Sequence, residues 1–305
     1  MIKKVMKRFH EQNGNAMVLA SLAMIALLTM TGLVLDGGKL YMTRAHLQKV
    51  ANAAALSGAQ ELTNNEAAVG SVVEKVLIDH QEEASLDELN IQMEDKVRVE
   101  LKKDVPLTFS KLFGVEQTPV KAEAAAELGV MGRAIGAAPL GIDDSIPLEY
   151  FREYKLKVDQ TEVDHGYFGV LALGGPGANI YEQNLRHGYQ DEINVGDVLE
   201  TQTGNIAGKT RQVIQDRLNA CPLPGDYTHR DCSRVILIPT YTPYNHEPNK
   251  QLKEVKVTGF AYFYITEPMH PHDTSITGMF IERTGTGFEE PTAKNKGAFA
   301  IRLTE

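Results

Sequence analysis

Residues 16–35 read AMVLASLAMIALLTMTGLVL, twenty residues without a single charge. At roughly 1.5 Å of rise per residue, a helix of this length is about 30 Å long, the thickness of a bilayer's hydrocarbon core. A cleaved signal peptide is the alternative, but its apolar region is shorter, about 7–15 residues, and a small-residue cleavage site follows closely. Here the run is followed by DGGKLYM. The stretch therefore predicts a retained transmembrane helix.

The charge of the chain is unevenly distributed around this helix. The 305 residues carry a net charge of −9, which argues against nucleic acid as a partner because phosphate binding needs a Lys- or Arg-rich face. The tail before the helix is nevertheless basic, with Lys3, Lys4, Lys7 and Arg8. Basic residues beside a span tend to stay in the cytoplasm, and long hydrophilic domains cross regardless of charge. We expect a single-pass protein of the cell membrane, with a cytoplasmic N-terminus and an extracytoplasmic C-terminal domain.

Beyond the apolar run the pattern becomes that of an amphipathic stalk helix. Gly37-Gly38 could loosen it, but apolar residues resume at spacings of three, four or seven up to Leu62. This face narrows to small residues, which allow another backbone to approach closely: Ala51, Ala54, Ala55 and Gly58. The face packs either on the chain's own following domain or on another subunit.

Residues 63–130 have the pattern of a small α+β unit. Asn64-Asn65 breaks the stalk helix, and a second helix is expected over 66–81. The acidic stretch 82–90 is interpreted as solvated. Alternating apolar residues predict strands at 97–101 and 120–128, which can pair, with a short helical turn at 107–113 between them.

From residue 131 onward, glycine, proline and short β-prone runs dominate. They predict a mostly antiparallel sheet, closed or sandwiched, with helical insertions near 178–187 and 209–219. Gly259 lies in a run long enough for a central strand and indicates a bulge or a close backbone approach. The predicted class is α+β. Residues 1–62 form the tail, transmembrane helix and stalk, 63–130 the small α+β unit, and 131–305 a β-rich extracytoplasmic domain.

Residues 14–62 read GNAMVLASLAMIALLTMTGLVLDGGKLYMTRAHLQKVANAAALSGAQEL and resemble the N-terminal domain of TadE/TadG-like Flp pilus-assembly proteins. In that family a Gly-Asn precedes the span, an Asp-x-Gly leads into a Tyr-containing helix, and a Leu-Gln and an Ala-rich run follow. The matching residues are Gly14, Asn15, Asp36, Gly38, Tyr41, Leu47, Gln48, Ala51, Asn52, Ala53, Ala54, Ala55, Leu56, Gly58 and Ala59. The resemblance implies a membrane-anchored accessory of a pilus or secretion apparatus that binds other subunits and is not an enzyme.

Two family features are missing from this sequence. Cleaved pseudopilins have a Glu five residues after the processing Gly, whereas counting five from Gly14 gives Leu19. The chain therefore resembles the uncleaved TadG-like branch. Longer members of that branch carry a von Willebrand A domain with a metal-binding Asp-x-Ser-x-Ser, and this sequence has no such motif. Adhesion through that domain is not implied.

Cys221 and Cys232 bracket the segment PLPGDYTHRD. In an exported chain, two cysteines at this spacing suggest one disulfide that closes a short loop. Free thiols are an alternative. A metal site that includes His229 is another, although these spacings match no standard zinc pattern.

The remaining motifs carry little chemistry. TGNIAGKT at 203–210 has three residues between its glycines where a phosphate loop needs four, so it is interpreted as a turn before a helix. GGPG at 174–177 lacks the dinucleotide-binding spacing and is interpreted as a tight turn. HPHD at 270–273 is interpreted as a loop, and Asp143-Asp144 and Glu289-Glu290 as solvated charge. We therefore predict no catalytic residue, no metal and no cofactor.

The leading hypothesis is an assembly protein that works by binding partner subunits, with Asp36 and Tyr41 at the membrane exit and the small-residue face in helix packing. The alternative is a surface-anchored envelope protein whose β-rich ectodomain binds a ligand or acts as an enzyme. The sequence does not identify a small-molecule ligand.

Overall fold

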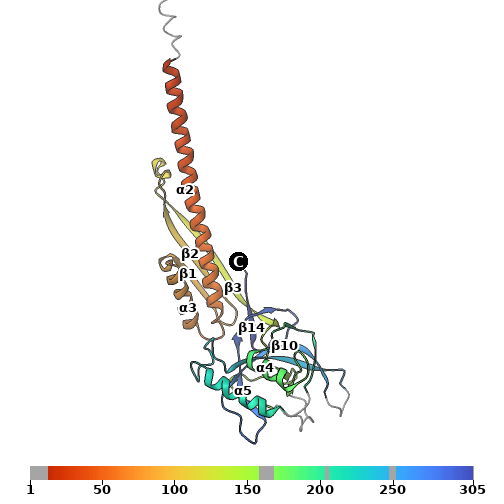
Figure 1. The fold of residues 1–305 in the computed structure, drawn as a ribbon. Coiled ribbons are helices and arrows are strands. Elements are labelled where there is room, and N and C mark those ends of the chain that lie inside the picture. Colours follow the sequence, from red (N-terminus) through yellow and green to blue (C-terminus); the bar gives the residue numbers. More distant parts are fainter. Residues whose placement is uncertain (1–12, 158–167, 203–205, 247–251, 305) are drawn as a thin grey trace, which may run out of the picture.

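The computed structural model describes residues 13–157, 168–202, 206–246 and 252–304. Its longest element is α2 (Asn13–Ala59), one helix of 47 residues that projects from the remainder as a rod (Figure 1). The N-terminal half of the rod stands free, and the C-terminal half lies along a sheet. Gly37 and Gly38 do not interrupt it, and a Cβ at either position would meet no other atom within 4 Å.

The C-terminal half of α2 and the helix α3 (Glu66–Asp79) cover one face of an antiparallel sheet. This sheet begins with β1 (Leu86–Gln92), β2 (Lys96–Pro106) and β3 (Gln117–Ala134), in that spatial order. The alternating apolar residues of β2 and β3 point into one core with the helices, among them Val97, Val99, Leu101, Ala122 and Ala124. The predicted pairing of the two strands is confirmed, from Lys96 opposite Glu127 to Pro106 opposite Gln117.

The local chemistry explains where these elements begin. Asn65 caps α3, since its side chain accepts a hydrogen bond from the N–H of Ala68. The turn between β2 and β3 contains a short helix, η3 (Ser110–Phe113), which confirms the short helical turn expected there. Gly114 ends η3 with a φ of 86°, a conformation that glycine adopts at little cost.

The prediction that residues 82–90 are solvated holds for most of their side chains but is wrong for Glu82 and Ser85. The segment forms η2 (Glu83–Ser85) and the edge strand β1, and both Glu82 and Ser85 are buried. The strand was hard to recognise because only Leu89 and Ile91 among its side chains pack against the core. A strand with one solvated face and one free edge buries few residues, so its apolar alternation is weak.

A second sheet forms most of the C-terminal region. Its order is β5 (Glu153–Lys157), β11 (Ser275–Ile281), β10 (Glu254–Ile265), β9 (Val235–Tyr244), β4 (Leu140–Asp143) and β6 (Phe168–Val170), and β8 (Val198–Glu200) pairs with β10. All pairs are antiparallel except β4 with β9. The helices α4 (Ala178–His187) and α5 (Ala207–Ala220) bury apolar side chains against this sheet, as expected.

Gly259 lies at a register shift between β10 and β9, so the predicted bulge is confirmed. A Cβ there would lie 2.6 Å from the carbonyl oxygen of Lys294, which also explains the need for glycine. The chain class is therefore α+β, with a long apolar N-terminal helix and a mostly antiparallel C-terminal region.

Several elements connect the two halves of the molecule. Residues 126–130 of β3 pair with β14 (Ala298–Leu303), and residues 131–134 pair with β7 (Ile193–Asn194) and β13 (Gly287–Glu289). β14 also pairs in parallel with β12 (Arg283–Thr284). Arg230 pairs with Glu61 at 3.1 Å and donates to the carbonyl oxygen of Thr284 at 3.0 Å. The C-terminal region is thus fastened to the chain just after α2. The domain division at residues 62 and 130 stays a prediction.

Candidate functional site

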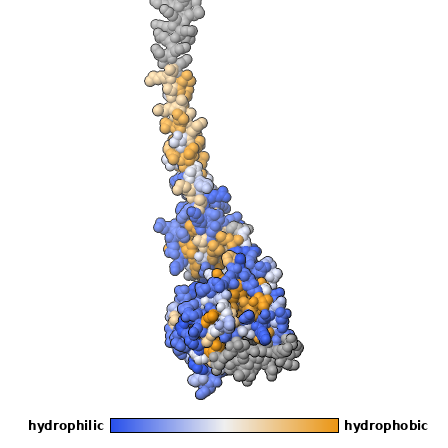
Figure 2. Space-filling view, turned by 45° about the vertical axis from the view of Figure 1, so that its right-hand side comes forward, coloured by the Kyte–Doolittle hydropathy of each residue, from blue (hydrophilic) through white to orange (hydrophobic). Residues whose placement is uncertain are grey.

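The free half of α2 has the length and composition of a membrane span. Only 6% of its most apolar 18-residue window is buried, unlike a core helix of a soluble protein. Its polar groups are satisfied within the helix: the hydroxyls of Ser21, Thr29 and Thr31 donate to the carbonyls of Met17, Ile25 and Leu27. Figure 2 shows apolar residues along the face of the rod in view. The predicted basic tail lies outside the described residues.

Asp36 lies one residue after the apolar run and is only 4% exposed. Its carboxylate accepts hydrogen bonds from the N–H groups of Thr108, Phe109 and Ser110, at 2.6 to 2.9 Å, and from the Ser110 hydroxyl at 2.8 Å. These N–H groups lie at the start of η3, where the N–H groups of a helix have no hydrogen-bond acceptor within the helix itself. Asp36 therefore acts as the cap of a helix 72 to 74 residues away in the sequence.

Two further contacts fasten the same hairpin to α2. Lys39 Nζ donates to the carbonyl oxygen of Pro106 at 2.7 Å. The ring of Phe109 lies directly on Gly32, where a Cβ would stand 2.5 Å from Phe109 Cδ1. Tyr41, the other residue predicted at the membrane exit, is 75% exposed and makes no part of this attachment.

The small residues of the stalk are buried within the chain itself. Ala51, Ala54 and Ala55 have no exposed surface and belong to the core that α2 forms with α3, β2 and β3. A Cβ at Gly58 would lie 2.8 Å from Cγ2 of Val73 on α3, so this glycine permits the close approach of the two helices. Of the two alternatives open from sequence, the structure has this face packed on the chain's own domain.

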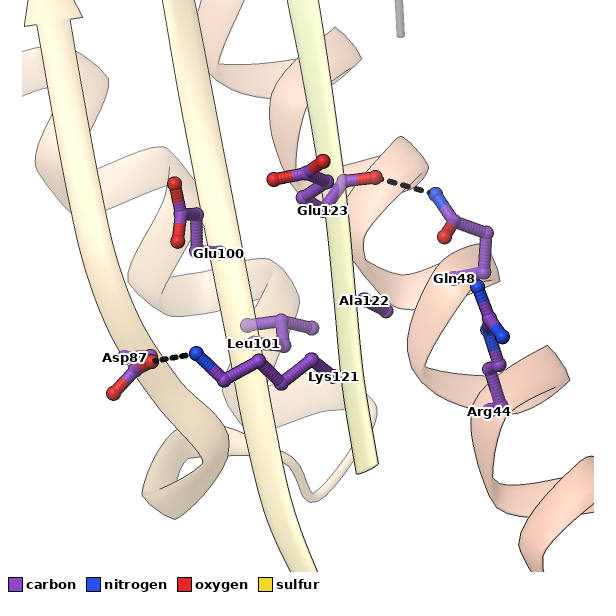
Figure 3. A pocket seen from close by; sticks show the side chains of 8 residues that line it. All are labelled: Arg44, Gln48, Asp87, Glu100, Leu101, Lys121, Ala122 and Glu123. Carbon is purple, nitrogen blue, oxygen red and sulfur yellow. Dashed lines mark hydrogen bonds and ion pairs between the residues drawn. The ribbon is translucent and has the colours of Figure 1, made fainter. Parts of the chain in front are cut away.

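A groove of about 480 Å³ opens between α2 and the sheet. Figure 3 shows its lining, which mixes both signs of charge: Arg44, Gln48, Asp87, Glu100, Leu101, Lys121, Ala122 and Glu123. Lys121 pairs with Asp87 at 3.8 Å, and the Gln48 amide donates to the Glu123 carbonyl oxygen at 2.6 Å. β14 pairs with β3 only over Ala126–Val130, and no described strand pairs with the same edge of β3 at residues 117–124.

Cys221 and Cys232 are joined as a disulfide and are buried beside Tyr264 and Ile281. Of the disulfide, the free thiols and the metal site that the sequence left open, the structure has the disulfide.

The other motifs lie in turns. Gly174, Gly175 and Gly177 all have positive φ in the turn before α4. Residues 203–205 of the phosphate-loop-like stretch lie outside the described residues, and its remainder enters α5. His270 and His272 are exposed between β10 and β11.

Sequence reasoning missed two buried carboxylates. Glu82 receives the ammonium of Lys103 and the hydroxyl of Ser85, each at 2.5 Å, and lies 3.4 Å from His46 Nε2. Burial acts to raise the pKa of Glu82, but the bonds from Lys103 and Ser85 and the positive charges of Lys103 and His46 outweigh it and lower the pKa. Asp144, interpreted as solvated, is also buried and pairs with Lys294 and Lys296.

Comparison with known proteins bears on α2 alone. No curated protein and no solved structure matches the chain. One family model does, and its match begins just before the apolar run and ends just after α2. Residues 14–61, which carry the span, the Asp36 cap and the small-residue face, match the family described as putative Flp pilus-assembly TadE/G-like and confirm the resemblance for this segment.

Proposed function

We propose that this chain is a single-pass, membrane-anchored accessory or structural component of a Flp/Tad-type pilus or secretion assembly and acts by binding other subunits. One observation carries the proposal. The segment that matches the pilus-assembly family is a single helix whose first half exposes its apolar side chains and whose second half is built into a folded domain. Such a helix can place the domain at a membrane surface and still present a face to neighbouring helices.

The burial of the small-residue face changes where partners would bind. Ala51, Ala54, Ala55 and Gly58 are occupied by the chain's own core, so we assign partner contacts to the exposed surface of the span. Helices associate in lipid through close packing, without a hydrophobic driving force. The groove beside residues 117–124 of β3 offers a second surface, since no described strand pairs with this edge and only the Glu123 carbonyl accepts a hydrogen bond there from Gln48.

The charge distribution supports an orientation. The basic residues before the span favour a cytoplasmic N-terminus, and we propose that the acidic C-terminal domain is extracytoplasmic. This topology can be tested by adding a protease to protoplasts or spheroplasts, whose cytoplasmic membrane is intact, and measuring cleavage of a C-terminal tag. Protection of the tag until the membrane is broken would reverse the assignment.

Site-specific photocrosslinking tests the binding role. A photoreactive residue at Leu28, exposed on the span, is expected to capture membrane subunits of the assembly in cells that build it. The matched control is Leu223, an exposed leucine of the ectodomain. Capture of lipid alone at Leu28, with no protein adduct, would reject partner binding through the span. The ligand-binding or enzymatic ectodomain stays an alternative prediction.

A further inference from the structure

The tip of the β2–β3 hairpin exposes apolar side chains beside the membrane span. Leu112 is 81% exposed and Phe113 is 64% exposed, and both belong to η3 at the end of the hairpin. Val115 follows them and is also exposed. Three large apolar side chains exposed within four residues make this tip a candidate contact surface.

The position of the hairpin tip relative to α2 is fixed. Three contacts fix its position along α2: the Phe109 ring on Gly32, the η3 amides on Asp36, and Pro106 on Lys39. Figure 1 shows the hairpin rising beside α2, with its tip the part nearest to the free end of the helix. The tip therefore lies at a defined height on the rod.

That height is inside the apolar run. Gly32 comes three residues before Leu35, the last residue of the run, so it lies about 4.5 Å toward the bilayer at 1.5 Å per residue. The neighbouring surface of α2 is apolar and exposed, with Leu28, Leu33 and Leu35. If residues 16–35 cross the hydrocarbon core, the hairpin tip must enter its boundary.

We propose that the tip of the β2–β3 hairpin, residues 107–116, is a second membrane contact, in which Leu112 and Phe113 enter the lipid at the boundary between acyl chains and headgroups. The proposal rests on the membrane anchoring proposed above. It does not depend on the direction of insertion, because hairpin and ectodomain both follow the span in the chain and lie on the same side.

The charged groups of the tip suit this boundary. Lys111 and Glu116 pair at 3.6 Å, and both are well exposed, so their charged ends can reach the headgroups while Leu112 and Phe113 face the acyl chains. The second contact would hold the hairpin tip at the membrane boundary.

Tryptophan fluorescence gives a direct test, because the chain contains no tryptophan. Phe113→Trp, in the full chain reconstituted in vesicles of phosphatidylcholine and phosphatidylglycerol, places a single reporter on the tip. Leu112→Trp gives a second reporter. Phe288→Trp, at a similarly exposed ectodomain position on β13, is the matched control, and Leu28→Trp reports on the span itself.

We expect lipids brominated near the headgroup to quench both tip reporters, with a blue-shifted emission, and to leave Phe288→Trp unchanged. Tip reporters that emit as the control does, while Leu28→Trp is quenched, would overturn the second contact and leave the anchor intact. An unquenched Leu28→Trp would reject the anchor and the second contact together.

Discussion

The ring of Phe109 lies on the backbone of α2 at Gly32, at a distance that leaves no room for a Cβ. Residues 77 positions apart in sequence thereby join the apolar half of α2 to the β2–β3 hairpin. We predict that Gly32→Leu displaces the β2–β3 hairpin from α2. In detergent-solubilised full-length protein, trypsin should then cleave after Lys111 faster than in the wild type.

The matched control for this prediction is Gly38→Leu. Gly38 is also within α2, but a Cβ there meets no atom within 4 Å. Cleavage at Lys111 should stay at the wild-type rate in this variant. Equal acceleration in both variants would show that the general stiffness of the helix, and not the Phe109 contact, protects the hairpin.

A second prediction concerns the cap that Asp36 provides. Asp36→Ala removes the acceptor for three N–H groups of residues 108–110, and each unmet bond costs about 1–3 kcal/mol unless water replaces it. The hairpin tip should therefore open locally, with amide hydrogen exchange at 108–110 faster by about tenfold or more. Tyr41→Ala, at an exposed position of the same helix, should leave these rates unchanged.

A third prediction separates intramolecular packing from partner binding at the stalk. Gly58→Leu overfills the contact between α2 and α3 and should lower the free energy of unfolding by about 1–3 kcal/mol. Gly70→Leu, at a half-buried position of α3 where a Cβ would meet no atom within 4 Å, should cause no loss. Denaturant unfolding of the purified protein, without any partner, measures both. An unchanged denaturation midpoint for Gly58→Leu would contradict the packing of this face on α3 and would favour a contact with another subunit.

A fourth prediction follows from the lowered pKa of Glu82. A lowered folded pKa means that the ion pair contributes its full stability above the ordinary Glu pKa of 4.5 and loses it as pH falls through the folded value. Because Lys103 is half exposed, we expect Glu82→Gln to cost only about 1 kcal/mol at neutral pH. The difference between variant and wild type should shrink below pH 4.5 in unfolding measured against pH. A difference that stays constant with pH would contradict the ion pair.

A fifth prediction concerns Cys221 and Cys232. Mass spectrometry of the non-reduced, exported protein should find their two peptides linked. By the loop-entropy model, breaking this link should lower the free energy of unfolding by about 3 kcal/mol. Replacing both cysteines by serine should have the same effect as a reducing agent. Unlinked peptides in correctly exported protein would reject the disulfide.

The elements that sequence predicted well have strong local patterns. The long apolar helix, the pairing of β2 with β3, the helices α4 and α5 and the bulge at Gly259 all follow from periodicity or from one conformationally special residue. Propensity and burial agree at these places, so a short window of sequence suffices.

The features that escaped prediction depend on residues far apart in the chain. Asp36 is recognisable as a conspicuous charge at the end of the span, but its partners are at 108–110. Glu82 looked solvated because its neighbours are acidic, whereas Lys103 and His46 come from other elements. The small residues of the stalk were predicted to pack on the chain's own domain or on another subunit, and only the folded chain shows that α3 and the sheet cover them.

The continuity of α2 through Gly37 and Gly38 leaves no joint between the apolar half of the helix and the folded domain. From Asp36 to Ala59 the helix extends about 35 Å beyond the span at 1.5 Å per residue. A change in span tilt of about 20°, a common tilt for such helices, would therefore carry Ala59 sideways by about 12 Å. Because Arg230 also fastens the C-terminal region to the chain just after α2, a small change in the tilt of the proposed span would produce a large displacement of the whole folded domain.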